Sequence, residues 1–152
     1  MNRLLKIAAF GLALGLASAV GTASANEEMI LTKAHEGSAV APSSPIKVDK
    51  ATGPDAYTVG ELHAKGAALD KKKVTVRGKV VKVSAGIMNR NWIHLRDGSG
   101  DQAKGTHNIV VTSQDSPAVG DVVTAKGILA KDKDFGSGYL YAVIIEGASV
   151  KK

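Results

Sequence analysis

The fold of this 152-residue chain is decided by residues 73–83, which read KVTVRGKVVKV. Valines alternate with polar residues up to Val80, which is the pattern of a strand with one buried face. The pattern then shifts by one place, because Val81 and Val83 flank Lys82. A strand whose buried face changes just after a glycine is typical of a strongly bent strand that serves two sheets in turn.

Four further strands are predicted along the chain, and turns rich in glycine separate most of them. They are centred on Ile93 and Leu95, on Ile109 and Val111, on residues 122–130, and on residues 139–145. The fourth strand of the set contains Gly127, a second glycine in mid-strand. Five strands in one short domain, two of them with a central glycine, predict an all-β protein and a small five-stranded barrel of the OB type.

One short α-helix is predicted before the first strand. Thr58 and Glu61 have the spacing of a capping box, and apolar residues continue to about Leu69. We expect this helix to close one end of the barrel. His63 falls on the helix, and we assign it no role.

Residues 1–25 have the order of a secretory signal. Arg3 and Lys6 precede an uncharged apolar run over residues 7–20, and Ala23-Ser24-Ala25 fits a cleavage site. The run is shorter than the roughly 20 residues that a membrane-spanning helix needs. We therefore expect cleavage, export to the periplasm, and no transmembrane segment in the mature chain. Cleavage would remove two of the six net positive charges.

The rest of the chain divides into a tail, residues 26–56, and an ordered domain, residues 57–152. The tail is rich in proline and serine near its end, which is typical of an extended linker. Met29 and His35 lie in it, and thioether and imidazole groups suit Cu(I), although a solvated tail is the simpler interpretation. The chain has no cysteine, which excludes disulfides, thiol nucleophiles and thiolate metal or haem sites.

The strand around Ile93 and Leu95 carries the candidate binding residues. If these two side chains face the interior, then Trp92, His94 and Arg96 face outward. An exposed indole beside an imidazole and a guanidinium is typical of a surface that stacks bases and neutralises phosphates. Further candidates for this face are Lys79, Lys82, Arg90, Lys126, Tyr139 and Tyr141. The alternative is that Trp92 packs over the rim of the barrel and the lysines form an ordinary solvated surface.

Motifs of catalysis and metal binding do not occur in the sequence. It contains no Gly-x-Ser-x-Gly elbow, no phosphate-binding glycine-rich loop with a lysine, and no His-Glu-x-x-His. The strand alternation also places His94 and His107 on different faces, which argues against a metal-binding pair. We therefore expect a protein without catalytic residues, bound metal or cofactor.

Four segments resemble a known family. They are residues 76–82 (VRGKVVK), 86–98 (GIMNRNWIHLRDG), 119–123 (VGDVV) and 131–139 (KDKDFGSGY). They are similar to a group of exported bacterial OB-fold proteins that are often labelled nucleotide- or DNA-binding. Some members resemble an accessory protein found beside periplasmic nitrite reductase and multihaem cytochrome genes. The similarity covers about residues 57–150; it implies an OB fold and a binding or accessory role, and it carries over no catalytic residue.

Two functions follow as hypotheses. The first is an exported, monomeric, non-enzymatic OB-fold module that binds an anionic or oligomeric ligand, such as single-stranded nucleic acid, around Trp92. The second is a periplasmic accessory protein that contacts a protein partner during the maturation of redox proteins such as cytochromes, or that handles copper. The copper version would use Met88 and His94 together with the tail residues.

Overall fold

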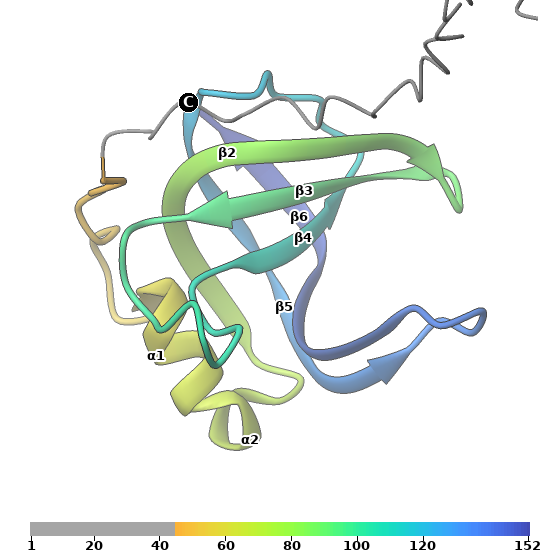
Figure 1. Ribbon diagram of the computed structural model, residues 1–152, viewed down its shortest axis with the longest axis horizontal. Helices are drawn as coiled ribbons and strands as arrows, with labels where there is room; N and C mark the ends of the chain where they lie inside the picture. The colour runs from red at the N-terminus through yellow and green to blue at the C-terminus, as the bar shows by residue number, and fades with distance from the viewer. Residues whose placement is uncertain (1–44) are drawn as a thin grey trace, which may run out of the picture. The chain divides into compact units, whose positions relative to one another are not determined.

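The computed structural model describes residues 45–152, which form six strands and two short helices (Figure 1). The prediction of an all-β protein is confirmed. The predicted signal over residues 1–25, the first part of the predicted tail, and Met29 and His35 all lie outside the described residues. The elements are β1 (Ala56–Tyr57), α1 (Val59–Ala64), α2 (Gly66–Leu69), β2 (Lys73–Ile87), β3 (Arg90–Arg96), β4 (Ile109–Ser113), β5 (Val122–Asp134) and β6 (Leu140–Lys151).

The strands form one hydrogen-bonded sheet in the order β1-β2-β3-β4-β6-β5, and β5 also pairs with β2. Each of the five long strands therefore has a neighbour on both sides. Most pairs are antiparallel, whereas β1–β2 and β4–β6 are parallel. The pairings therefore form a closed cycle in which each long strand is bonded to two others, each over part of its length.

Strand β2 is long and strongly curved, as its sequence predicts (Figure 1). Its first half pairs with β5 and its second half pairs with β3. Gly78 lies where the partners change, and a Cβ there would stand 3.1 Å from the carbonyl oxygen of Arg96. The register with β3 shifts between Val80 and Lys82. This β-bulge is the structural form of the shifted valine pattern, and it places Lys82 on the outer face.

The core is built from aliphatic side chains of every long strand and of both helices. Its fully buried members include Leu62, Val76, Val80, Ile93, Leu95, Ile109, Val111, Leu129 and Ile145. Burying a side chain of this size contributes about 1.5–3 kcal/mol. The alternation predicted around Ile93 and Leu95 is therefore confirmed: both face the interior.

Helix α1 begins with the predicted capping box. The backbone N–H of Glu61 donates to Thr58 Oγ1 over 3.2 Å, and the N–H of Thr58 donates to Glu61 Oε2 over 2.8 Å. The single predicted helix is in fact two, because the backbone leaves helical geometry at Lys65 before α2 ends at Leu69. Both helices lie at one end of the sheet, near the start of β2 (Figure 1).

Residues 45–56, predicted as the end of the tail, lie against the domain. The N–H of Val48 donates to the carbonyl of Asp97 over 3.0 Å, and Lys50 Nζ lies 2.8 Å from Glu61 Oε2. Two residues of β1 then pair with β2. Among the described residues, neither helix has the length and apolar character needed to cross a membrane.

We predict that Asp97→Ala lowers the free energy of unfolding by about 1–3 kcal/mol. The buried Asp97 carboxylate accepts the N–H of Val59, at the start of α1, over 2.9 Å, and it also accepts both the N–H and the hydroxyl of Ser99. Chemical denaturation should show the loss. The matched control is Asp49→Ala at an exposed position, and equal stability of the two variants would contradict this role.

Candidate functional site

The nine site residues predicted from the sequence do not form one surface. Trp92, His94 and Arg96 do alternate with Ile93 and Leu95, and so point to the outer face of β3. The structure divides this face into an aromatic part around Trp92 and a charged part around His94 and Arg96.

The prediction of an exposed indole at Trp92 is wrong. The side chain is only 3% exposed, and its Nε1–H donates to the carbonyl of Ile87 over 2.9 Å. The observed position of Trp92 is that of the alternative interpretation, in which the indole packs against the rest of the protein.

Trp92 is covered by aromatic residues of the hairpin between β5 and β6, which extends away from the rest of the sheet in Figure 1. The ring of Phe135 meets the indole edge-on at a centroid distance of 5.0 Å, and Tyr141 stacks at 5.6 Å. Tyr139 lies at 6.0 Å and stays partly exposed. Tyr139 and Tyr141 were predicted beside Trp92, whereas Phe135 was missed, although four of the chain's six aromatic residues lie in this cluster.

The charged part of the face surrounds a pocket of about 560 Å³, which we call the basic pocket. Four of the predicted residues line it: Lys79 and Lys82 from β2, and His94 and Arg96 from β3. The other lining residues are Ile46, Val80, Val81, Asn108, Val119 and Gly120.

The basic side chains of the pocket stand in cross-strand pairs, one of which joins two permanently charged groups. Lys79 is opposite Arg96, and Lys82 is opposite His94. Side chains directly opposite each other on one face are close neighbours, and like charges in this arrangement destabilise a sheet. The β-bulge after Val80 is the reason that both lysines reach the same face although they are three residues apart.

Carboxylates do not compensate this charge. Lys79, Lys82 and Arg96 make no ion pair within residues 45–152. Asp121 is close in sequence to the pocket wall, but it binds Lys152 Nζ at 3.0 Å and the N–H of Ala118. The basic pocket therefore keeps its positive charge.

His94 is the titratable group of the basic pocket. Burial lowers the pKa of His94 below its ordinary value of 6.5, and the charges of Lys82 and Arg96 lower this pKa further. Its Nδ1 lies 3.2 Å from the amide nitrogen of Asn108. When that amide donates, the neutral ring carries its proton on Nε2, and this N–H is free to donate to a ligand.

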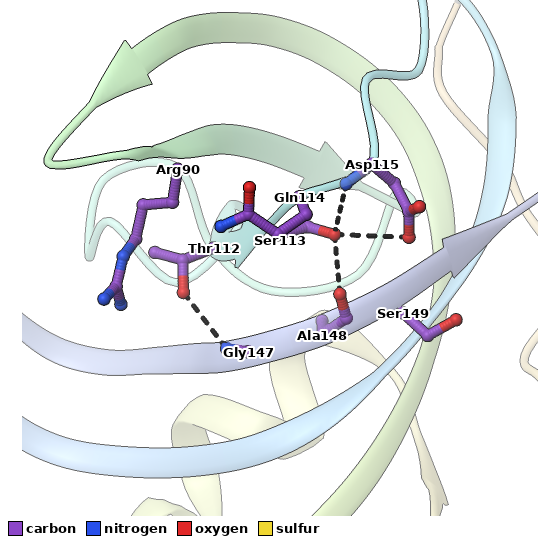
Figure 2. Close-up of a pocket in the computed structure, with 8 residues that line it drawn as sticks. All are labelled: Arg90, Thr112, Ser113, Gln114, Asp115, Gly147, Ala148 and Ser149. Carbon is purple, nitrogen blue, oxygen red and sulfur yellow. Dashed lines mark hydrogen bonds between the residues drawn. The ribbon is translucent and has the colours of Figure 1, made fainter.

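Arg90 faces a different pocket, of about 450 Å³, which Figure 2 shows with all its lining residues. Most of the polar groups that line this pocket hold β4 to β6. Ser113 Oγ donates to the carbonyl of Ala148 over 2.6 Å, and the N–H of Gly147 donates to Thr112 Oγ1. The distance from Arg90 Nη1 to Glu146 Oε1 is 4.0 Å. We therefore interpret this pocket as the place where β4 and β6 join, and not as a reactive site.

Lys126 does not join either group. It lines a small depression between β5 and β6 together with Thr124, Ser149 and Lys151.

In the part of the chain that the structure describes, no three His, Asp or Glu side chains gather closely enough to hold a metal ion. Met88 lies in the tight turn between β2 and β3.

Sequence reasoning missed several residues of the basic pocket. Asn108 lies in a loop, and Ile46 belongs to the segment predicted as a tail. Val119 lies in the connection between β4 and β5. No periodic pattern marks these residues, since they come to the pocket from irregular segments.

Comparison of the chain with models of protein families, with curated proteins and with solved structures finds no match. The site is therefore interpreted from its own geometry.

We predict that the fluorescence of Trp92 reports a buried indole. It is the chain's single tryptophan, so the emission spectrum is unambiguous. The maximum should lie at a shorter wavelength than that of free tryptophan, and acrylamide should quench it weakly. Emission and quenching like those of the urea-unfolded chain would contradict the packing described above.

We also predict that the pKa of His94, measured by NMR titration of the imidazole, lies below 6.5. Lys82→Gln should raise this pKa, because a nearby positive charge disfavours the protonated ring. The pKa should still remain below 6.5, since burial is the larger cause. Lys126→Gln removes the same charge elsewhere and should leave the pKa of His94 unchanged. An equal pKa shift in both variants would contradict a local effect of the Lys82 charge.

Proposed function

We propose that this chain is an exported, non-enzymatic OB-fold module that binds an anionic ligand in the basic pocket. The closed cycle of five paired strands, the curved and bulged β2, and the helices at one end support the OB-type barrel. The order of charged, apolar and small residues over 1–25 supports export.

The observation that carries the proposal is a group of three cations, Lys79, Lys82 and Arg96, without a carboxylate partner among the described residues. The like charges of Lys79 and Arg96 stand opposite each other and weaken the unliganded sheet, and Lys82 adds a third cation opposite the neutral ring of His94. An anion that contacts these groups would relieve their repulsion. Bulges that re-aim a side chain are common next to functional sites, and the bulge after Val80 brings Lys82 to the pocket.

The lining of the basic pocket favours recognition by charge. Its lining residues include no Phe, Tyr or Trp, so the imidazole of His94 is the one ring among them on which a base could stack, and the indole of Trp92 is covered. Single-stranded nucleic acid would therefore bind through its phosphates, with little preference among bases. Ile46 and Val119 give the pocket an apolar side for the organic part of a ligand.

A binding role also agrees with the chemistry of the groups present. The lining residues of the basic pocket supply cations, one amide and one neutral imidazole, with no hydroxyl nucleophile or carboxylate base among them. Such groups hold and orient an anion, as arginine and lysine do in phosphate sites.

We predict that Lys82→Gln lowers the affinity of the protein for polyanions by about tenfold, because each charged contact contributes about 1.5–3 kcal/mol. Binding of inorganic polyphosphate and of a fluorescent oligothymidylate is measured at several salt concentrations. Both should bind more weakly as salt rises, and the salt dependence should be smaller for the variant.

Lys126→Gln is the matched control, because it makes the same charge change away from the basic pocket. It should retain the affinity of the unmodified protein within about twofold. Equal losses in the two variants, or no binding of either polyanion at low salt, would overturn the proposal.

A further inference from the structure

A second pocket adjoins the basic pocket. It has a volume of about 270 Å³ and is lined by Pro45, Ile46, Arg96, Gly98, Ser99, Gly100, Gln102 and His107. We call it the loop pocket, because most of its wall is the loop that follows β3. Arg96 and Ile46 line both pockets, so the two spaces meet at these side chains.

The backbone between the two pockets packs closely, because the segment with Ile46 lies against the end of β3. The N–H of Val48 donates to the carbonyl of Asp97 over 3.0 Å, which holds the segment with Ile46 across the end of β3. Gly98, at φ +92°, allows this approach, since a Cβ there would stand 2.1 Å from the carbonyl oxygen of Ile46. The backbone that directly follows Arg96 is thus held against residues 46–48.

Two buried nitrogen atoms at the junction lack a partner within the described residues. They are Nε of Arg96 and Nδ1 of His107. Buried polar atoms are almost always hydrogen-bonded in folded proteins, so each of them calls for a group that the protein does not supply. Arg96 Nε–H is a donor only, which requires an acceptor such as an anionic oxygen.

Acidic side chains near the loop pocket already have partners. Asp97 accepts from Val59 and Ser99. Asp101 accepts the N–H of Ala103 over 2.8 Å and lies 4.0 Å from Lys104 Nζ. Asp101 is close enough to affect the pKa of His107, but its carboxylate accepts no hydrogen bond from either of these two nitrogen atoms. The described residues therefore supply no acceptor for Arg96 Nε.

We propose that the basic pocket and the loop pocket together bind a diphosphate group, with one phosphate among Lys79, Lys82 and His94 and the second between Arg96 and His107. This inference rests on the proposed anion-binding function and specifies its ligand class. A guanidinium presents five N–H donors in a planar fork, so Arg96 can contact both phosphates at once. A single phosphate would leave one of the two groups of donors unused.

The experiment compares orthophosphate, pyrophosphate and ADP by isothermal titration calorimetry with the unmodified protein, His107→Phe and Arg96→Lys. Pyrophosphate should bind at least about tenfold more tightly than orthophosphate, because it engages both groups of donors. ADP binding as tightly as pyrophosphate, or more tightly, indicates an organic diphosphate, whereas weaker ADP binding indicates the inorganic ion. Both results support the diphosphate site.

The variants separate the two pockets. His107→Phe keeps a ring but removes its nitrogen atoms, so it should weaken pyrophosphate about tenfold and leave orthophosphate unchanged within about twofold. Arg96→Lys keeps the charge and loses the fork, and it should reduce the advantage of pyrophosphate over orthophosphate. Thermal unfolding and Trp92 fluorescence show that each variant is folded.

Failure of this inference is distinct from failure of the proposed function. Equal affinities for orthophosphate and pyrophosphate, both dependent on Lys82, would overturn the diphosphate site and leave the anion-binding pocket standing. An unchanged pyrophosphate affinity in a folded His107→Phe protein would also overturn it. No binding of any phosphate, together with no binding of polyanions, would overturn both.

Discussion

The double pairing of β2 is the constraint on which the rest of the structure depends. One strand must bond to β5 along its first half and to β3 along its second half, so its backbone has to turn between two partners. Gly78 makes room for the close approach of β3, and the bulge after Val80 absorbs the change in register. Without this bend the cycle of five strands would stay open, and the aliphatic core would lose part of its wall.

The same bend determines the chemistry of the outer face. Lys82 stands opposite His94 only because the bulge moves it across, and Lys79 stands opposite Arg96. A sheet selected for stability alone would avoid placing Lys79 opposite Arg96, since like charges opposite each other weaken strand pairing. Local features that conflict with stability are expected where a protein binds something. The proposed binding of an anion would account for this arrangement.

The long hairpin of β5 and β6 divides the outer face of β3 between two roles. Phe135 and Tyr141 pack on Trp92 and make that part of the strand a second apolar cluster, together with Val110 and Ile144. The hairpin leaves the other end of β3 open. The single tryptophan consequently stabilises the fold, and the polar groups farther along the same strand remain available to a ligand.

The five long strands, their inward faces, the bend in β2 and the capped start of α1 could be determined from the sequence, because period-two alternation, mid-strand glycines and the spacing of Thr58 and Glu61 act over a few residues, whereas the short strand β1 and the break between the two helices were not predicted. The outward direction of Trp92 was likewise determined by alternation. Whether it stays exposed was decided only by the tertiary structure, because the covering side chains come from a hairpin more than 40 residues away. The same holds for the basic pocket: Ile46 and Asn108 reach it from irregular segments, and Lys126 is excluded from it. Local patterns specify which way a side chain points, whereas long-range packing specifies what it meets there.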